Sequence, residues 1–596
     1  MTGHTVVAGT TCLLTVEGAD LTGGLDGFFV DDCRHLSRLV LHVPGSSLRV
    51  LRADPGSTVY VHDTGRHTDP PYVLVRRRRV RPGELVETLE LTGLTAAPQT
   101  VQVGYEVAAD FADQFELRSA RTFGKAGAIR GTETSGGRVT YSYARDGFTR
   151  ATTVETEPAA EHLTWSVRLP PHAPVTLRLV VTASPAAGAG ASADRPVPTV
   201  HRDDLARCVR QGLSDLDALT MPAPGVPGAV LPAAGAPWFL TVFGRDSLLT
   251  SMFALRHRPE LAAGTLQALA ACQGRVTDES RAEEPGKIIH ETRRGELATL
   301  GEVPYACYYG SVDATPLFLM LLDAYHDVTG DDRLAARLEP AARAAVSWML
   351  GPGGLTGGYL RYRTDLPGLV HHCWKDSGDS IVFRDGTPAA GPVAVAEAQG
   401  YAYRALLGAA RLAGRLWHDP SWSAELTATA AGLRNRFAAD FRLPDGFVAL
   451  ALDATGAAVD TAASNAGHLL WCGLLDDDWA DTVAARLAGD DFFSGWGIRT
   501  LAAGQLPYHP MSYHRGGVWP HDTAIAVAGL AAAGRRDEAA IVADGLIAAA
   551  AHTGDRLPEV MTGLTREPGH GPVPYPHSCS PQAWAAAAPL LLLLTL

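Results

Sequence analysis

The chain has 596 residues, several times the length of an ordinary domain, so we expect two or three domains with room for a large core. Its hydrophobic fraction of 46% and charged fraction of 19% are those of an ordinary globular protein and exclude a disordered one. The formal net charge of −13 argues against a nucleic-acid partner, because phosphate backbones are bound by clustered Lys and Arg.

Cysteines and termini indicate the compartment. The eight cysteines are scattered and include no Cys-x-x-Cys pair, which argues against a zinc ribbon and favours reduced thiols. The N-terminus lacks the basic start and apolar core of an export signal. The apolar run at residues 590–594 is far shorter than the ~20 residues that cross a bilayer. We therefore expect a cytoplasmic protein with no membrane partner, in which this run belongs to a buried helix.

The first third of the chain has the pattern of strands. From Val6 to about Thr182, short runs alternate in polarity between Gly, Pro and Asp residues, as at 84–91 and 163–169. This pattern predicts an antiparallel β-sandwich. A basic run at residues 76–79 lies in one strand-like stretch, and we interpret it as a solvated sheet edge rather than a binding patch.

The rest of the chain has the pattern of helices. Residues 183–202, rich in Ala, Gly, Ser and Pro, resemble a linker. Beyond it, apolar-periodic segments such as 314–328 and 395–413 predict about a dozen helices. Alternate helices are expected to begin near Arg245, Asp313, Val395, Ala462, Trp519 and Ser580. Six such hairpins predict an (α/α)6 toroid. The expected division is a β-sandwich at 1–182, a linker at 183–202 and a toroid at 203–596.

Polar and aromatic residues recur in the loops that enter the six expected inner helices. Singly they have ordinary explanations, since Asp246, Asp313 and Ser580 could cap helices and Trp519 could be core. Taken together, aromatic side chains interleaved with carboxylates and amides favour a sugar pocket. Glycoside hydrolysis needs two carboxyl groups. Spacing alone does not select them, because the helical region contains many Asp and Glu residues.

Several segments resemble bacterial glycogen-debranching and amylo-α-1,6-glucosidase proteins. In the helical region they are APWFLTVFGRDSLLT (236–250), KIIHETRRGE (287–296), YYGSVDATP (308–316), CWKDS (373–377), LPE (557–559) and CSPQAW (579–584). In the N-terminal region, DDCRHLS (31–37) and DFADQFE (110–116) resemble the companion β-domain of that family. The resemblance spans both expected domains and implies an inverting α/α-toroid glycosidase.

The resemblance implies the catalytic pair. Asp376, two residues after Trp374, matches the general acid, and Glu559 in Leu-Pro-Glu matches the general base. Asp379 is the alternative acid or a supporting group, and Glu291 is a second candidate base. An inverting enzyme predicts carboxyl groups roughly 6.5 to 9.5 Å apart. The acid is expected to have a raised pKa, aided by apolar cover from Trp374, and Glu559 is expected to stay ionised.

The resemblance also implies a set of substrate-binding side chains. They are Trp238, Arg245, Asp246, Glu291, Tyr309, Asp313, Trp374, Asp379, His514, Trp519 and His521. The histidines lack a His-x-x-x-His helix spacing, so we expect no metal and no cofactor.

The expected substrate is an α-glucan. With no room for a transferase half, the chain is expected to be an exo-acting hydrolase that removes one α-linked glucosyl residue, such as the α-1,6 branch stub of glycogen. Two alternatives stay open. One is a toroid glycosidase or phosphorylase acting on trehalose, glucosylglycerate or mannosylglycerate, and the other is an inactive glycan-binding homologue. The sequence does not indicate an oligomeric state.

Overall fold

The structure is a computed structural model that describes residues 4–16, 18–54, 56–65, 69–119, 122–185, 188 and 196–596. It contains two compact units. The first is Met1–Gly190 together with Ala236–Thr241 and Arg293–Val303. The second is Ala191–Gly235, Val242–Thr292 and Pro304–Leu596. The first unit thus takes in two short segments that the sequence-based division gave to the helical domain.

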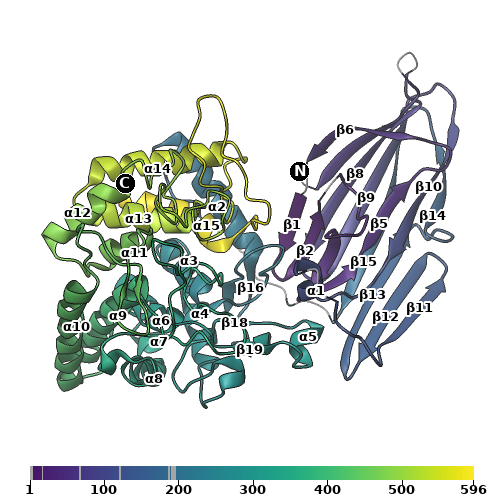
Figure 1. Cartoon of the computed structure of the whole chain (residues 1–596). Helices are drawn as coiled ribbons and strands as arrows, with labels where there is room; N and C mark the ends of the chain where they lie inside the picture. The colour runs from purple at the N-terminus through teal and green to yellow at the C-terminus, as the bar shows by residue number, and fades with distance from the viewer. Residues whose placement is uncertain are drawn as a thin grey trace. The chain divides into compact units, whose positions relative to one another are not determined.

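The first unit is built from antiparallel strands (Figure 1). They are β1 (His4–Ala8), β2 (Thr11–Thr15), β3 (Gly27–Val30), β4 (Cys33–Leu36), β5 (Arg38–His42), β6 (Leu48–Asp54), β7 (Ser57–His62), β8 (Tyr72–Arg81), β9 (Glu84–Gly93), β10 (Gln99–Ala108), β11 (Ile129–Ser135), β12 (Arg138–Arg145), β13 (Phe148–Glu157), β14 (Thr164–Leu169) and β15 (Pro174–Ser184), with one short helix, α1 (Gln114–Arg118). Their order is β11-β12-β13-β15-β9-β8-β7-β6 in one sheet, β14-β10-β5 in another and β1-β2-β3-β4 in a third.

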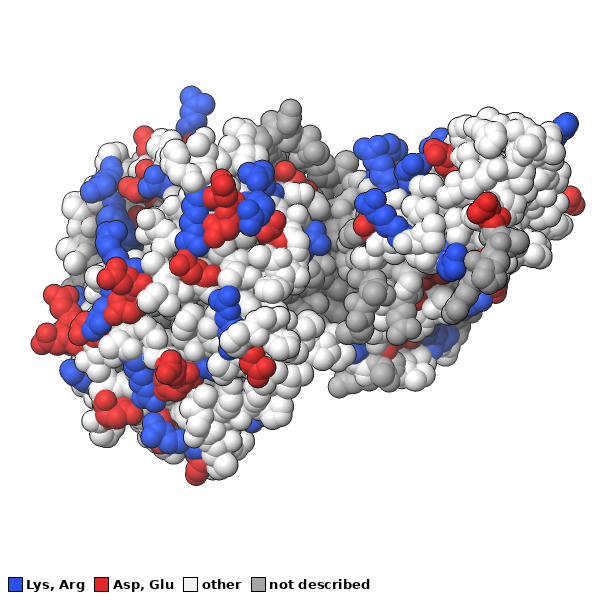
Figure 2. Space-filling model, turned by 90° about the horizontal axis from the view of Figure 1, so that it is seen from above, with Lys and Arg blue, Asp and Glu red and all other residues white. Residues whose placement is uncertain are grey.

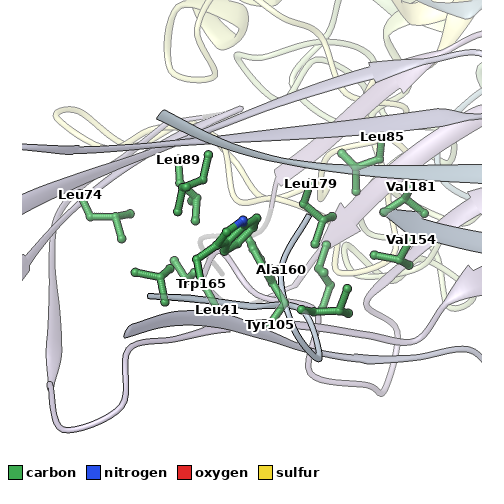
Figure 3. Packing of buried hydrophobic residues seen from close by; sticks show 14 of the residues in the cluster. Leu41, Leu74, Leu85, Leu89, Tyr105, Val154, Ala160, Trp165, Leu179 and Val181 are labelled. Atoms are coloured by element: carbon green, nitrogen blue, oxygen red, sulfur yellow. The ribbon is translucent and has the colours of Figure 1, made fainter. Parts of the chain in front are cut away.

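One apolar core joins these sheets. The alternating strand pattern turns every second side chain inward, so Leu85, Leu89 and Leu91 of β9 are buried. Trp165 of β14 lies among residues from the eight-stranded and the three-stranded sheets, including Leu89 and Tyr105 (Figure 3). Its indole N–H donates to the backbone oxygen of Pro158 at 2.7 Å, which satisfies its polar atom. The predicted β-sandwich is confirmed.

The basic run at residues 76–79 was interpreted wrongly as a solvated edge. It lies in β8, which pairs with β7 on one side and β9 on the other. Alternation turns Arg76 inward, where it is 1% exposed and donates two hydrogen bonds to Glu87 of β9, at 2.8 and 2.9 Å. Arg78 also donates to Glu87, at 2.7 Å. Burial raises the pKa of Glu87, but the two arginines outweigh it and lower that pKa to about 2.

The predicted linker falls mostly on residues that the structure does not describe. Strand β15 continues to Ser184, two residues into the expected linker, and residues 186–187 and 189–195 lie outside the described part of the chain. The first helix after it, α2, begins at Asp203.

The second unit is mainly helical (Figure 1). Its helices are α2 (Asp203–Leu219), α3 (Gly244–Ala254), α4 (Pro259–Ala271), α6 (Ala314–Thr329), α7 (Asp332–Arg337), α8 (Glu339–Leu350), α9 (Ala396–Arg415), α10 (Pro420–Asp440), α11 (Asn465–Cys472), α12 (Asp477–Leu487), α13 (Pro520–Ala532), α14 (Arg536–Ala551) and α15 (Ala583–Thr595). The short helix α5 (Glu296–Thr299) belongs, with α1, to the first unit. Short 3₁₀ turns are η1 (Glu279–Arg281), η2 (Pro304–Ala306) and η3 (Leu355–Gly357). Short strands between the helices are β16 (Thr220–Pro222), β17 (Val230–Pro232), β18 (Glu291–Thr292), β19 (Cys307–Tyr308), β20 (Ala394–Val395), β21 (Ala451–Leu452) and β22 (Ala458–Val459).

Six helices form a closed inner ring. Each of α3, α6, α9, α11, α13 and α15 packs on the next, and α15 packs back on α3. Almost every residue of α3 and α15 is buried, because an inner helix is covered on all sides. The outer helices α2, α4, α8, α10, α12 and α14 pack against inner ones. The predicted (α/α)6 toroid is confirmed. The apolar run at residues 590–594 lies in helix α15, where residues 590–592 are buried as expected but Leu594 is 44% exposed.

Surface and thiol features agree with the composition. Acidic and basic side chains are intermixed on the face seen in Figure 2. All eight cysteines are free thiols, and six of them are buried. Within the described residues, no helix combines the length and the apolar character that crossing a membrane requires.

Candidate active site

The site lies at the N-terminal ends of the inner helices. The first turns of α3, α9 and α13 contain Asp246, Glu397 and Asp522. Asp313 immediately precedes α6, yet its side chain makes no capping hydrogen bond. The helix-cap explanation therefore fails for Asp313, whose carboxylate is used elsewhere.

Polar and aromatic contacts link these first turns around the ring. Arg245 of α3 donates to Asp313 at 2.8 Å, and Asn465 of α11 donates to Glu397 of α9 at 2.7 Å. His468 of α11 is hydrogen-bonded to Asp522 of α13, and His521 of α13 stacks on Trp584 of α15. Gln582, which immediately precedes α15, donates to Asp246 of α3. Segments that are hundreds of residues apart in the sequence thus meet at one end of the toroid.

Arg245 lies beside two of the carboxylates, those of Asp313 and Asp376. It is 2% exposed and lies 2.8 Å from Asp313 and 3.5 Å from Asp376, measured between side-chain nitrogen and oxygen. Burial lowers the pKa of the guanidinium, but Asp313, Asp376 and Asp246 raise it, and the net shift is upward. Arg245 is therefore a fixed positive charge beside the predicted acid.

Asp376 is the more open of the two predicted catalytic residues. Its side chain is 30% exposed, and its neighbours are charged or polar, with Arg245 at 3.5 Å and His290 Nε2 at 3.8 Å. Trp374, expected to give it apolar cover, makes ring contacts instead with His468, His514, Trp519 and His521.

Glu559 is buried and held by two donors. The Tyr513 hydroxyl donates to Oε1 at 2.7 Å, and the backbone N–H of Cys579 donates to Oε2 at 2.9 Å. The side chain has 2% relative exposure. Two donors on the carboxyl oxygens favour a carboxylate of fixed orientation.

The pKa of Asp246 depends on the charges of both predicted catalytic residues. Burial raises the pKa of its carboxyl to about 8, Arg245 opposes this shift, and the charges of Asp376, Glu559 and Asp313 add to it. Because charges act on a pKa only at short range, Asp376 and Glu559 belong to one electrostatic neighbourhood. With a pKa of about 8, Asp246 carries a proton at neutral pH and can donate a hydrogen bond.

Four predicted residues form an aromatic cluster. Trp374 lies 5.0 Å from His521, 5.6 Å from His514 and 5.7 Å from Trp519, measured between ring centroids. His514 stacks on Trp519 at 5.2 Å. Burial lowers the pKa of both His514 and His521 well below the ordinary value, so both imidazoles are neutral at pH 7. Neutral rings can both donate and accept hydrogen bonds.

Four other predicted residues have different surroundings. Asp379 is 57% exposed and pairs with Arg515 at 2.7 Å. The Tyr309 hydroxyl donates to the backbone oxygen of Cys272 at 2.8 Å. Glu291 is buried, with Oε1 3.5 Å from His290 Nδ1. Trp238 belongs to the first unit, where its ring lies 6.4 Å from that of Phe29. Their roles in binding stay predictions.

The structure adds residues that the sequence reasoning did not single out. Tyr513 holds Glu559, and Trp584 stacks on His521 at 3.8 Å. The sequence contained a sign of both residues, because Tyr513 precedes the predicted site residue His514 and Trp584 ends the CSPQAW segment. His468 and Tyr401 had none, because both lie outside the segments that resemble the family. Among the described residues, no cluster of three or more His, Cys, Asp or Glu side chains is arranged to hold a metal ion.

Comparison with known proteins finds a family match in each of the two parts of the chain. Residues 6–180 match the N-terminal domain of (some) glycogen debranching enzymes. Residues 355–578 match the mannosylglycerate hydrolase MGH1-like glycoside hydrolase domain. Comparison with curated proteins finds no match.

Among solved structures, similar chains include the GH63 mannosylglycerate hydrolase from Thermus thermophilus in complex with Tris, at 16% identity and a TM-score of 0.49, covering 65% of this chain and 100% of that one. Its complex with Tris and D-glycerate gives 17% identity, a TM-score of 0.48 and the same coverage. A wild-type glycosidase gives 17% identity and a TM-score of 0.45, covering 66% and 98%. At these identities and TM-scores, the similarity bears on neither mechanism nor substrate. The chain thus combines a segment similar to the N-terminal domain of (some) glycogen debranching enzymes with a segment similar to an MGH1-like glycoside hydrolase domain.

Proposed function

We propose that the second unit cleaves glycosidic bonds with inversion, using Asp376 as general acid and Glu559 as general base. One observation carries the proposal: Tyr513 donates to Glu559 at 2.7 Å, and the adjacent His514 lies 2.7 Å from the hydroxyl of Ser377, the residue next to Asp376. A glycosidase requires two carboxyl groups flanking one bond, and this proximity supports that arrangement for two residues that are far apart in the sequence.

The difference between their surroundings suits the two roles. The partly exposed Asp376 meets the leaving group, and its proton passes to the glycosidic oxygen as the bond to the anomeric carbon breaks. Glu559, with both oxygens oriented by Tyr513 and Cys579, takes a proton from the water that attacks the opposite face of the sugar. Solvent then returns Asp376 and Glu559 to their starting protonation states.

Unsatisfied polar atoms support a sugar ligand at the same place. Among the described residues, buried side-chain nitrogens without a hydrogen-bond partner include those of Trp374, His514, His521 and Trp584. Buried polar groups are nearly always paired, so a partner from outside the protein is expected. Sugar hydroxyls both donate and accept hydrogen bonds, and sugar ring faces pack on aromatic rings.

Our first candidate substrate is a terminal α-linked glucosyl residue of an α-glucan, such as the α-1,6 branch stub. The match of residues 6–180 to an N-terminal domain of debranching enzymes supports it. The second candidate is a small glycoside such as mannosylglycerate, because residues 355–578 match an MGH1-like domain. A cytoplasmic location is part of the proposal, and the eight free thiols support it.

The test is to identify the product and its anomer by NMR. The enzyme is incubated with limit dextrin, isomaltose, trehalose, glucosylglycerate and mannosylglycerate, and the first-formed sugar is observed before it mutarotates. We expect β-glucose from an α-glucoside. Release of the transferred sugar, rather than the leaving group, as the α-anomer would overturn the inverting mechanism. Turnover of mannosylglycerate alone would select the second candidate.

A further inference from the structure

A chain of buried polar side chains lies beneath Trp374. Tyr401 of α9 is hydrogen-bonded to Nδ1 of His468 on α11, and Nε2 of His468 lies 2.8 Å from Asp522 of α13. All three side chains are 0 to 1% exposed. Three consecutive inner helices of the ring are thereby joined through a single imidazole.

The partners of His468 fix its orientation. Burial raises the pKa of the Tyr401 hydroxyl well above its ordinary value, so the hydroxyl keeps its proton, and it donates to Nδ1 when the Asp522 carboxylate, which can only accept, takes the hydrogen of Nε2. The second nitrogen, Nε2, then carries the hydrogen and donates to the Asp522 carboxylate. Both nitrogens are used, and the imidazole plane cannot rotate without breaking a buried hydrogen bond.

The indole ring of Trp374 is stacked on the imidazole ring of His468. The ring centroids are 5.9 Å apart and the ring planes are 15° from parallel. Trp374 begins the Trp374-Lys375-Asp376 segment, so the position of its ring bears on the predicted acid two residues later. The same segment is anchored by Lys375, whose Nζ donates to the backbone oxygen of Thr500 at 2.6 Å.

We propose that His468 is a positioning residue for the general acid: the Tyr401–His468–Asp522 chain holds the imidazole flat under Trp374 and thereby keeps Asp376 beside Arg245. His468 does not touch substrate, since it is buried and Trp374 covers it. The inference rests on the proposed function, because it names what supports the acid of that reaction.

The primary variant is Tyr401→Phe, which removes one hydroxyl from the far end of the chain. We expect kcat to fall about 10-fold with KM changed less than about twofold, because a displaced acid lowers the rate of the chemical step more than it weakens binding. The matched control is Tyr359→Phe. It removes the hydroxyl of a buried tyrosine that donates to Asp440 at 2.7 Å and is not part of the Tyr401–His468–Asp522 hydrogen-bond chain. The control is expected to keep the wild-type kcat.

A second pair of variants tests rescue. Asp522→Asn retains an oxygen that accepts from His468 Nε2, so kcat is expected to stay within about threefold of wild type. Asp522→Ala removes the acceptor and is expected to match the loss in Tyr401→Phe. Equal loss in Asn and Ala variants would overturn the positioning role, and so would a wild-type kcat in Tyr401→Phe.

Near-UV circular dichroism separates this inference from the proposed function, since it needs no substrate. Tyr401→Phe is expected to change the tryptophan bands, and the same substitution in a Trp374→Phe background is expected to leave them unchanged. A change that persists without Trp374 would overturn the inference. If no glycoside is turned over while the Trp374-dependent change is observed, the proposed reaction fails and the support of Trp374 by His468 stands.

Discussion

At the residue scale, the two predicted catalytic carboxyls differ in exposure and in partners. Glu559 is 2% exposed and accepts two hydrogen bonds, whereas the side chain of Asp376 is 30% exposed beside Arg245. A base benefits from a fixed carboxylate, and an acid must reach the leaving group and exchange its proton with solvent. The exposure of each residue therefore suits the role that the resemblance implies, whereas the charge of Arg245 beside Asp376 favours the ionised form and opposes the protonation that an acid requires.

Removing either carboxylate tests the pair. Asp376→Asn and Glu559→Gln preserve size but cannot transfer a proton, so each is expected to lower kcat by ~10²- to 10⁴-fold in steady-state assays. Asp379→Asn is the matched control, because Asp379 is largely exposed and pairs with Arg515. Near-normal turnover in either catalytic variant would remove that residue from its role. A loss in the control as large as in Asp376→Asn would favour Asp379 as the acid.

The protonated Asp246 predicts a pH-dependent stability. Its pKa is raised from 3.8 to about 8 in the folded protein, so between these values the folded state binds a proton that the unfolded state has lost. This group therefore makes the free energy of unfolding fall as pH rises towards 8. Asp246→Asn is expected to flatten that decline, as measured by chemical unfolding from pH 5 to pH 8.

Comparing wild type with Asp246→Asn at each pH isolates this group. The buried His514 and His521 oppose the trend below about pH 6.5, because burial lowers their pKa, but they are common to both proteins. The pKa of Lys375 is lowered to about 8, and its contribution changes mainly above that pH. Parallel stability curves for the two proteins would contradict a raised pKa at Asp246.

At the scale of elements, helix packing in the toroid depends on glycines at close contacts. A Cβ placed on Gly212 of α2 would lie 2.1 Å from the backbone oxygen of Ala586 in α15. One placed on Gly432 of α10 would meet only the flexible end of Arg436, at 3.3 Å. The two glycines lie in helix interiors but differ in the space beside them.

This contrast gives a prediction of opposite signs. Gly212→Ala is expected to lower the free energy of unfolding by about 1–3 kcal/mol, because the outer helix must move away from α15. Gly432→Ala is expected to raise it by up to about 1 kcal/mol through helix propensity alone. Guanidinium unfolding followed by far-UV circular dichroism measures both changes. A stabilising Gly212→Ala would mean that α2 and α15 are not in contact at this point.

Elements also show how far sequence patterns reach. The alternation at 84–91 and the apolar period at 314–328 predicted β9 and α6, because a strand or helix needs only its own residues and one apolar face. The same reasoning failed for Arg76 and Arg78, since their burial depends on Glu87 across the sheet. Nothing in a run of arginines indicates that a buried carboxylate on the neighbouring strand will pair with it.

At the scale of the whole molecule, the toroid depends on closure of its ring. Helix α15 packs on α13, α3 and α2, and so joins the end of the chain to the beginning of the helical unit (Figure 1). Its buried residues, such as Trp584 and Leu590, cover the neighbouring helices. Without α15 the ring would expose apolar surface on three helices.

Truncation tests this closure. Deleting residues 583–596 is expected to abolish the cooperative thermal transition of the helical unit in calorimetry, because its core loses one side. Deleting only residues 594–596, two of which are exposed leucines, is expected to leave that transition within a few degrees of wild type. If the variant without residues 583–596 kept the thermal transition of the full-length protein, closure of the ring would contribute little to its stability.

The sequence by itself determined the two-part architecture and the order of its elements, because strand alternation, helix length and turn residues act locally. Together with the family resemblance, it also nominated Asp376, Glu559 and the residues around them. Only the tertiary structure decided which side chains meet. It assigned residues 236–241 and 293–303 to the first unit, brought Tyr513 to Glu559, and set His468 beneath Trp374. The reason is physical: each of these relations joins groups far apart in the chain, and their energies exist only once the ring of helices has closed.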